Sequence, residues 1–230
     1  MAVTPRVVPV ERSNLTMKVY AELEAALFEG RLHPGQRLKI RDLAAGMGVS
    51  ETPIREAIMQ LARVGAVRFE AARAITVAGL THDEYLELRT IRLELEGLAA
   101  ETAARRITPA GIAALEAAHA ALTAAEAAGE GAAANKANWA FHRGLYAAAG
   151  MPQLSAIIDT VWLRNGPVHA FHYPEAPPAY PGRHRHLDIL DALRAGDPQA
   201  ARAALRADLM EGGRALVEFL RRRDAAKAGT

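Results

Sequence analysis

The sequence predicts a mainly α-helical protein with two domains, an N-terminal domain that contains a small β-hairpin and a C-terminal all-α six-helix bundle. Apolar residues recur at helical spacing through most of the 230 residues, and the pattern typical of strands is confined to residues 66–77. Half of the residues are hydrophobic, which is enough to bury a core in each domain. The predicted parts are a flexible arm (1–13), the first domain (14–78), a linker (79–81), the helical domain (82–224) and a flexible tail (225–230).

A pair of short helices joined by a tight turn dominates the first domain. An amphipathic helix over residues 15–29 precedes them and ends at Gly30. Gly48 is a suitable C-cap for the first helix of the pair, and Ser50 is a suitable N-cap for the second. In the second helix, one face is apolar and the adjacent face is free to contact a partner. The apolar face contains Ile54, Ile58, Leu61 and Val64, and the free face contains Glu51, Thr52, Arg55 and Met59.

Residues 66–70 and 74–77 predict two strands around a turn at 71–73. With the helix pair they give a winged helix-turn-helix, whose second helix fits the DNA major groove. Arg73, at the turn, either reaches a minor groove or phosphate, or is simply solvated.

The stretch GRLHPGQRLKIRDLAAGMGVSETPIREAIMQLARVGAV resembles the DNA-binding domain of the GntR family of bacterial transcription regulators. The resemblance implies that double-stranded operator DNA is the partner of this domain. It assigns the DNA contacts to Arg41, Ser50, Glu51, Thr52 and Arg55, with Arg41 and Arg55 as the main basic residues. Glu51 stands where the family often has Arg. It either accepts a hydrogen bond from a cytosine amine or is a favourable negative charge at a helix N-terminus.

The second domain is Ala-rich and helical by period. Pro and Gly breaks divide it into helices at about 82–106, 109–127, 135–149, 152–170, 180–195 and 198–223. The segments ALRAGDPQAARAALRADL and FHRGLYAAAG resemble the FCD domain of the FadR subfamily, and six helices suggest its VanR-like branch.

Four polar positions in this domain are predicted to converge on a divalent metal ion. Asn138 and His142 are spaced i, i+4 on one helix face. His186 and Asp208 are each 11 residues from Asp197, so an antiparallel helix pair would bring them to the same level. Imidazole and oxygen donors suit zinc, nickel or manganese. A metal-free polar pocket is the alternative.

The resemblance adds detail to this site. Metal-binding FCD domains usually have Asp and His at i, i+4 and two later His residues, so the chain matches at His142 and His186. It departs from that pattern at Asn138 and Asp208.

Two arginines are predicted to line the same pocket. Arg92 either grips an effector carboxylate or forms an ion pair with Glu96, and Arg164 shares an apolar stripe with Ile157, Val161 and Val168. We expect His184 to face away from His186. His169 and His172 either line the pocket mouth or lie at the surface.

Composition limits the classes of protein to which this chain can belong. The chain has no Cys, no signal-peptide pattern and no apolar run of membrane-spanning length, so we expect a cytoplasmic protein without a membrane partner. Residues 1–80 carry 11 Lys/Arg against 8 Asp/Glu, whereas residues 81–230 carry 17 against 18. The basic excess therefore lies in the domain expected to bind DNA.

The function that we expect is transcription regulation by a homodimer on a palindromic operator, modulated by a small organic acid. Repression released by the ligand is the commoner behaviour in the family, but the sequence itself does not distinguish a repressor from an activator. One alternative is a sensor for which the metal ion itself is the effector. The other is a metal-dependent enzyme, but no spare general base is evident beside the four positions.

Overall fold

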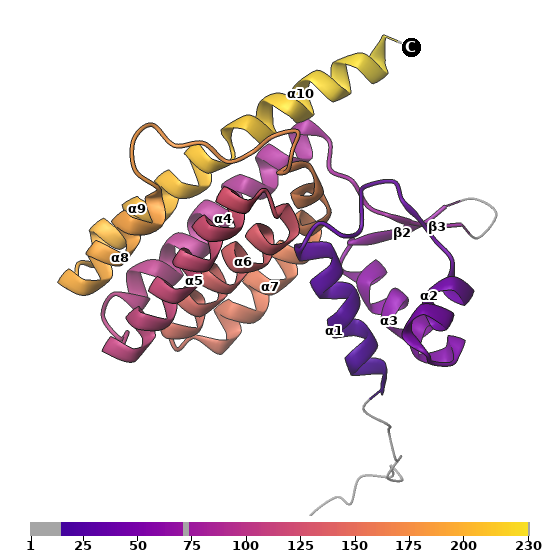
Figure 1. The fold of residues 1–230 in the computed structure, drawn as a ribbon, viewed down its shortest axis with the longest axis horizontal. Coiled ribbons are helices and arrows are strands. Elements are labelled where there is room, and N and C mark those ends of the chain that lie inside the picture. The colour runs from indigo at the N-terminus through magenta and orange to yellow at the C-terminus, as the bar shows by residue number, and fades with distance from the viewer. Residues whose placement is uncertain (1–14, 71–73, 230) are drawn as a thin grey trace, which may run out of the picture.

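The computed structural model describes residues 15–70 and 74–229, which form a small N-terminal domain beside a larger helical domain (Figure 1). The first domain contains α1 (Leu15–Phe28), β1 (Arg37–Leu38), α2 (Ile40–Met47), α3 (Glu51–Arg63), β2 (Val67–Phe69) and β3 (Ile75–Val77). The second contains α4 (His82–Ala103), α5 (Pro109–Ala128), α6 (Gly131–Ala148), α7 (Pro152–Asn165), the 3₁₀ helix η2 (Gly166–Phe171), α8 (Arg185–Ala195), α9 (Pro198–Gly212) and α10 (Arg214–Ala228). The predicted fold class, mainly α with a winged N-terminal domain and an all-α C-terminal domain, is confirmed, but the described part of the second domain has seven α-helices rather than the predicted six. The arm predicted over 1–13 lies outside the described residues, as does Arg73.

The helix pair of the first domain is built as its capping residues predict. Gly48 adopts a left-handed conformation with φ of 65°, and the N–H of Val49 bonds to the carbonyl of Ala44 at 3.0 Å. Ser50 precedes α3 with extended backbone, although its side chain makes no capping bond. Ile54 and Ile58 are buried in the domain core. The opposite face of α3 therefore remains available for contact.

The wing is a three-stranded antiparallel sheet with strand order β1-β3-β2. Arg68 pairs with Thr76 between β2 and β3, and Leu38 pairs with Ile75 between β1 and β3. The strands β2 and β3 were predicted. The strand β1 was not, because two residues are too short to show an alternating pattern.

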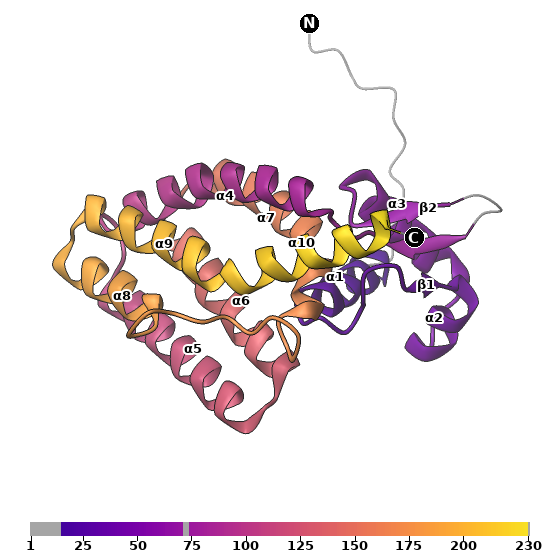
Figure 2. The same ribbon diagram turned by 90° about the horizontal axis from the view of Figure 1, so that it is seen from above.

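In the helical domain, α4 packs against α6, α7, α9 and α10, and α8 packs against α5 and α9 (Figure 2). The domain begins at a capping box, in which Thr81 Oγ1 accepts from the N–H of Glu84 and Glu84 accepts from the N–H of Thr81. The end of the helix predicted over 152–170 is η2, and the helix predicted from 180 begins at Arg185.

The last predicted helix, 198–223, is divided into α9 and α10 at Gly213. A Cβ atom on Gly212 would lie 2.6 Å from the hydroxyl of Tyr180, and one on Gly213 would lie 2.8 Å from the hydroxyl of Tyr85. The two glycines thus leave room for two tyrosines beside the backbone. The tail predicted over 225–230 is helical as far as Ala228.

The two domains share one hydrophobic core. Helix α1 packs against α3 on one side and against η2, α6 and α7 on the other. The ring of Phe28 lies 4.4 Å from that of Trp139 and 6.3 Å from that of Trp162. Gly30 follows α1 with φ of 74°, and a Cβ there would lie 3.0 Å from the Cα of Ala170. The contact between the domains is therefore tight. Within the described residues, no helix is both long and apolar enough to cross a bilayer.

Candidate functional site

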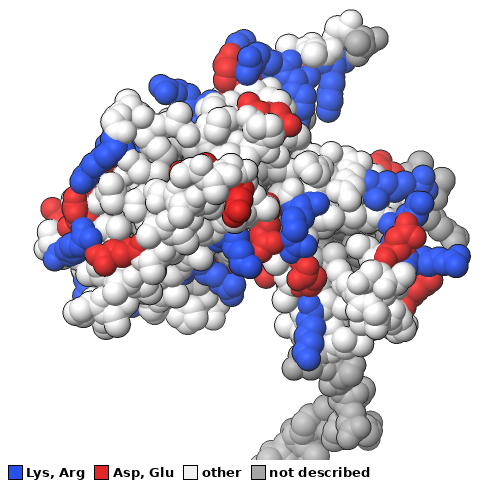
Figure 3. All heavy atoms as spheres, viewed as in Figure 1, with Lys and Arg blue, Asp and Glu red and all other residues white. Residues whose placement is uncertain are grey.

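The exposed face of α3 and the start of α2 form the candidate DNA-binding surface. It contains the five described residues assigned to DNA contact, all of which are exposed: Arg41, Ser50, Glu51, Thr52 and Arg55. Arg55 donates to Glu51 at 2.7 Å, one turn away on the same helix. In Figure 3, Lys and Arg spheres alternate with acidic ones over the N-terminal domain. In the free protein, the main predicted base-reading arginine is therefore already paired with a carboxylate.

A second candidate site lies inside the helical domain. Among the described residues, every buried polar or charged side chain belongs to this domain. They are Arg92, Glu96, Asn135, His142, Asn165, His169, His186 and Asp208. Burying such groups costs free energy unless they are paired, so their concentration in one domain marks a candidate functional centre.

Three of the four predicted metal ligands converge at this centre. His142 Nε2 lies 3.3 Å from Asp208 Oδ2 and 3.4 Å from His186 Nε2, and His186 Nε2 lies 4.0 Å from Asp208 Oδ1. The fourth, Asn138, lines the adjoining cavity one turn before His142 on α6. The antiparallel pair α8 and α9 brings His186 level with Asp208, as the spacing around Asp197 predicts.

A chain of buried hydrogen bonds orients His142. The Tyr146 hydroxyl donates to Glu96 Oε2 at 2.5 Å and lies 3.1 Å from His142 Nδ1. Because the hydroxyl proton is directed to Glu96, the Tyr146 oxygen is left to accept from His142 Nδ1–H. His142 Nε2 then carries a lone pair toward His186 and Asp208. His142 Nε2 and Asp208 Oδ2 are then both electron-rich, so at a separation of 3.3 Å they require a cation or a proton between them.

Asp208 remains ionised in this environment. Burial alone would raise its pKa, but the neighbouring His186 and His142 outweigh burial and hold the pKa of Asp208 well below its usual range. The Tyr180 hydroxyl donates to Asp208 Oδ1 at 2.9 Å. Burial and the Asp208 carboxylate raise the pKa of Tyr180, which keeps this hydroxyl protonated as a donor. The centre therefore holds a permanent negative charge beside two imidazoles.

The two arginines predicted for the pocket have different positions. Arg92 is buried, lines the cavity and forms the ion pair with Glu96, with Nε 2.6 Å from Oε1. The prediction for Arg164 is wrong. Its side chain is exposed, at a hollow that Glu84 also lines, and it lies near Gly65 of the first domain. Ile157, on its predicted stripe, is 53% exposed, so that stripe is not the inner face of α7.

The cavity beside the centre has a volume of about 50 Å³. His169 and His172 line it together with Tyr180, so they belong to the pocket rather than to the surface. Burial, followed by the positive charge of Arg92, lowers the pKa of His172 to about 4. A volume this small admits an ion and a few further atoms.

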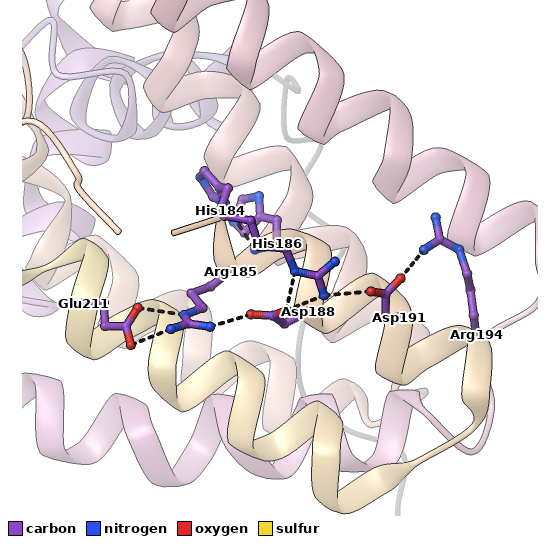
Figure 4. A network of polar contacts seen from close by, with 8 residues as sticks. His184, Arg185, His186, Asp188, Asp191, Arg194 and Glu211 are labelled. Carbon is purple, nitrogen blue, oxygen red and sulfur yellow. Dashed lines mark hydrogen bonds and ion pairs between the residues drawn. The ribbon is translucent and has the colours of Figure 1, made fainter. Parts of the chain in front are cut away.

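The sequence reasoning missed two histidines and two tyrosines of this centre. His184 was expected to face away, but it precedes α8, so helical spacing does not apply, and its ring lies 4.3 Å from that of His186. In Figure 4, both rings extend to one side of α8, whereas Arg185 extends toward Glu211. His119 of α5 lies 5.4 Å from His186, ring to ring. Only Tyr146 had a sequence signal, since it is spaced i, i+4 from His142.

A larger open groove of about 910 Å³ lies between the wing and the ends of α4 and α10. Four of its charged groups form ion pairs with one another, since Arg68 pairs with Glu84 and Arg223 pairs with Asp224. Arg223 also donates to the carbonyl of Leu80. The smaller cavity is therefore the better candidate for a specific ligand.

Comparison with known proteins assigns a family to each of the two domains. Residues 15–77 match the profile of the bacterial regulatory proteins, gntR family, and residues 87–211 match that of the FCD domain. The chain is 33% identical to the HTH-type transcriptional regulator McbR of Escherichia coli (strain K12), over 89% of this chain and 93% of that one. This chain belongs to the GntR family and carries an FCD domain.

Further relatives of this GntR-family chain are consistent with that assignment. It is 28% identical to the "Probable D-xylose utilization operon transcriptional repressor" of Paenarthrobacter nicotinovorans, over 84% of this chain and 85% of that one. The solved structure of E. coli McbR/YncC covers 90% of the chain with a TM-score of 0.81, at 32% identity and 99% coverage of that structure. A GntR regulator from Rhodococcus sp. RHA1 shares the fold, with a TM-score of 0.71, 24% identity and coverage of 89% and 98%. These families and relatives are transcriptional regulators and not enzymes, which removes the enzyme hypothesis.

Proposed function

We propose that this GntR-family regulator is a repressor whose operator binding is modulated by a small organic acid held in the helical domain with a divalent metal ion. The observation that carries the proposal is the convergence of His142, His186 and Asp208 on one buried point. Their ligand atoms all lie within 4.8 Å of one another.

The donors present fit a divalent ion. Two neutral imidazoles and one carboxylate suit zinc, nickel or manganese, and Asn138 adds an amide oxygen at the cavity wall. Tyr146 and Tyr180 hold His142 and Asp208 from behind, as hydrogen-bonded supports commonly do at metal sites. When bound, the ion supplies a positive charge toward which an acid is drawn.

An anionic effector follows from the charge of the site. One carboxylate and a divalent ion leave a net charge of +1, which favours a carboxylate ligand. Arg92 lines the same cavity, but Glu96 already neutralises it, so the ion is the main attraction for the acid. With about 50 Å³ of space, either the acid is small or Tyr180 and Pro178 at the wall move to admit it.

Shared packing provides a route from the pocket to the DNA-binding domain. Trp162 lines the cavity and contacts Phe28 at the end of α1. Asn135 donates to the carbonyls of both Glu29 and His169. A ligand that favours one arrangement of α6 and α7 therefore also biases the position of α1. A homodimer would place two such domains on the halves of a palindrome.

Elemental analysis of untagged protein, purified without chelator, tests the proposal. We expect a substantial fraction of one divalent ion per chain in the wild type and loss of that ion in His142→Ala, with the N-terminal domain still folded. Exposed His33→Ala is the matched control. Small carboxylic acids should then raise the melting temperature and change operator affinity only in the metal-loaded wild type. An absence of bound metal, together with no stabilisation by added zinc, nickel or manganese, would refute the metal part.

The small cavity also favours a second function, in which the ion alone is the effector. In that case operator affinity would follow the concentration of metal with no acid present. Measuring operator binding against metal, first without and then with a panel of acids, separates the two functions.

A further inference from the structure

A second cluster of imidazoles lies on the other side of His186. It consists of His119 on α5, His184 just before α8 and His186 on α8. Candidate ligand atoms of all three lie within 4.8 Å of one another. The ring of His184 lies 4.9 Å from that of His119 and 4.3 Å from that of His186. Figure 4 shows His184 and His186 side by side, away from the ion pairs that Arg185 and Asp188 form.

Two nitrogens in this cluster are buried without a partner. Among the described residues, neither His119 Nδ1 nor His186 Nδ1 has a hydrogen-bond partner. Phe141 stacks on the His186 ring with a distance of 3.7 Å between ring centroids and an angle of 4° between ring planes, which fixes the plane of the His186 ring. His186 Nε2 lies toward His142 and Asp208, and the two nitrogens lie on opposite sides of the imidazole. Unpaired buried nitrogens from two separate helices indicate that a partner of the cluster is missing.

We propose that His119, His184 and His186 form a second metal site, made only of nitrogen donors, which is an alternative to the site at His142, His186 and Asp208. A neutral imidazole has one nitrogen with a free lone pair. His186 therefore serves one ion at a time. The two sites exclude each other, and each chain binds one ion in one of two positions.

The two donor sets select different ions. Three imidazoles suit copper, nickel and zinc, whereas two imidazoles with a carboxylate suit harder ions such as manganese better. Binding at the nitrogen-only site has one structural cost. His184 Nδ1 accepts from the backbone N–H of His186 at 3.1 Å, and the ion replaces this helix-capping bond or requires the ring to turn. His184 is consequently the weakest of the three ligands.

Metal titration of the full-length, untagged protein tests this site, with copper(II), nickel(II) and manganese(II) each added alone. His119→Gln should weaken copper and nickel binding by about 10-fold or more and leave manganese unchanged. Asp208→Asn should weaken manganese binding in preference to copper. His186→Gln should weaken all three, and exposed His33→Gln should weaken none. The wild type should saturate at one ion per chain, and the electron paramagnetic resonance of bound copper should show nitrogen ligands that decrease in number in His119→Gln.

The inference shares His186 with the proposed function, but the two fail separately. Copper or nickel binding that is unchanged in His119→Gln would overturn the second site. Two copper ions bound together would overturn the mutual exclusion. If the binding of zinc, nickel and manganese does not depend on His142 or Asp208 while copper binding depends on His119, the metal site of the proposed function fails and the second site stands. Should His119→Gln not fold, as judged by circular dichroism, His184→Gln replaces it, and it should weaken copper and nickel binding in preference to manganese but by a smaller factor.

Discussion

Acid should destabilise this protein partly through His172, which follows η2 and lines the cavity. Its Nδ1 lies 3.3 Å from Asn135 Oδ1, and its ring stacks on that of His169 at 5.0 Å. Burial, followed by the charge of Arg92, lowers the pKa of His172 to about 4. The folded protein therefore excludes a proton that the unfolded chain accepts near pH 6.5.

The difference in pKa between the folded and unfolded states determines the direction and the size of the change in unfolding free energy. As pH falls from about 6.5 to about 4, the unfolded state binds the proton first, so the free energy of unfolding decreases. A pKa of about 4 in the folded state, against about 6.5 in the unfolded state, predicts a loss of about 2 kcal/mol at pH 5 from this residue. Replacement by Gln, which does not titrate, should remove that loss.

Urea unfolding at pH 7.5 and pH 5, in the presence of a chelator, measures the effect. The decrease in unfolding free energy between the two pH values should be about 2 kcal/mol smaller in His172→Gln than in the wild type. The exposed His33→Gln variant controls for loss of any histidine. An equal decrease in His172→Gln and the wild type would show that His172 is not held neutral, and the reasoning from burial would fail.

Three further outcomes are expected. Arg55→Ala should weaken operator binding by about 1–3 kcal/mol in fluorescence anisotropy, and unchanged affinity in a folded variant would remove its base-reading role. Selection from random DNA should give a site that differs from the common family consensus where Glu51 faces it, and recovery of that consensus would contradict the assignment. Glu96→Gln should destabilise the protein by about 3–5 kcal/mol, because it leaves Arg92 buried and unpaired, and the double variant Arg92→Met/Glu96→Leu should lose less; the reverse order would refute the buried-pair argument.

Local signals predicted the fold of the helix-turn-helix well. The turn at Gly48 and the stripe through Ile54 and Ile58 depend on residues a few positions apart, so capping preference and helical period are sufficient. The convergence of His186 and Asp208 was also predictable, because a tight turn at Asp197 fixes how α8 and α9 align.

The rest of the centre depends on packing between distant segments. His119 reaches His186 only because α5 packs against α8, and no local pattern reports that contact. Arg164 was misplaced because the less buried face of α7 also carries apolar residues such as Ile157. Helical spacing does not predict the direction of the His184 side chain, because α8 begins one residue after it.

The close packing of α1 against the helical domain limits how this protein can be recombined. Gly30 approaches Ala170, and Phe28 contacts both Trp139 and Trp162. The DNA-binding domain is therefore not an independent module joined at residues 79–81. A chimera that carries another regulator's operator specificity should transplant the segment from α2 to β3 and retain α1. If α1 is exchanged as well, the three aromatic residues and Gly30 must be matched to the new neighbour, or the hybrid will lose the packing that couples the pocket to the DNA-binding domain in the proposed function.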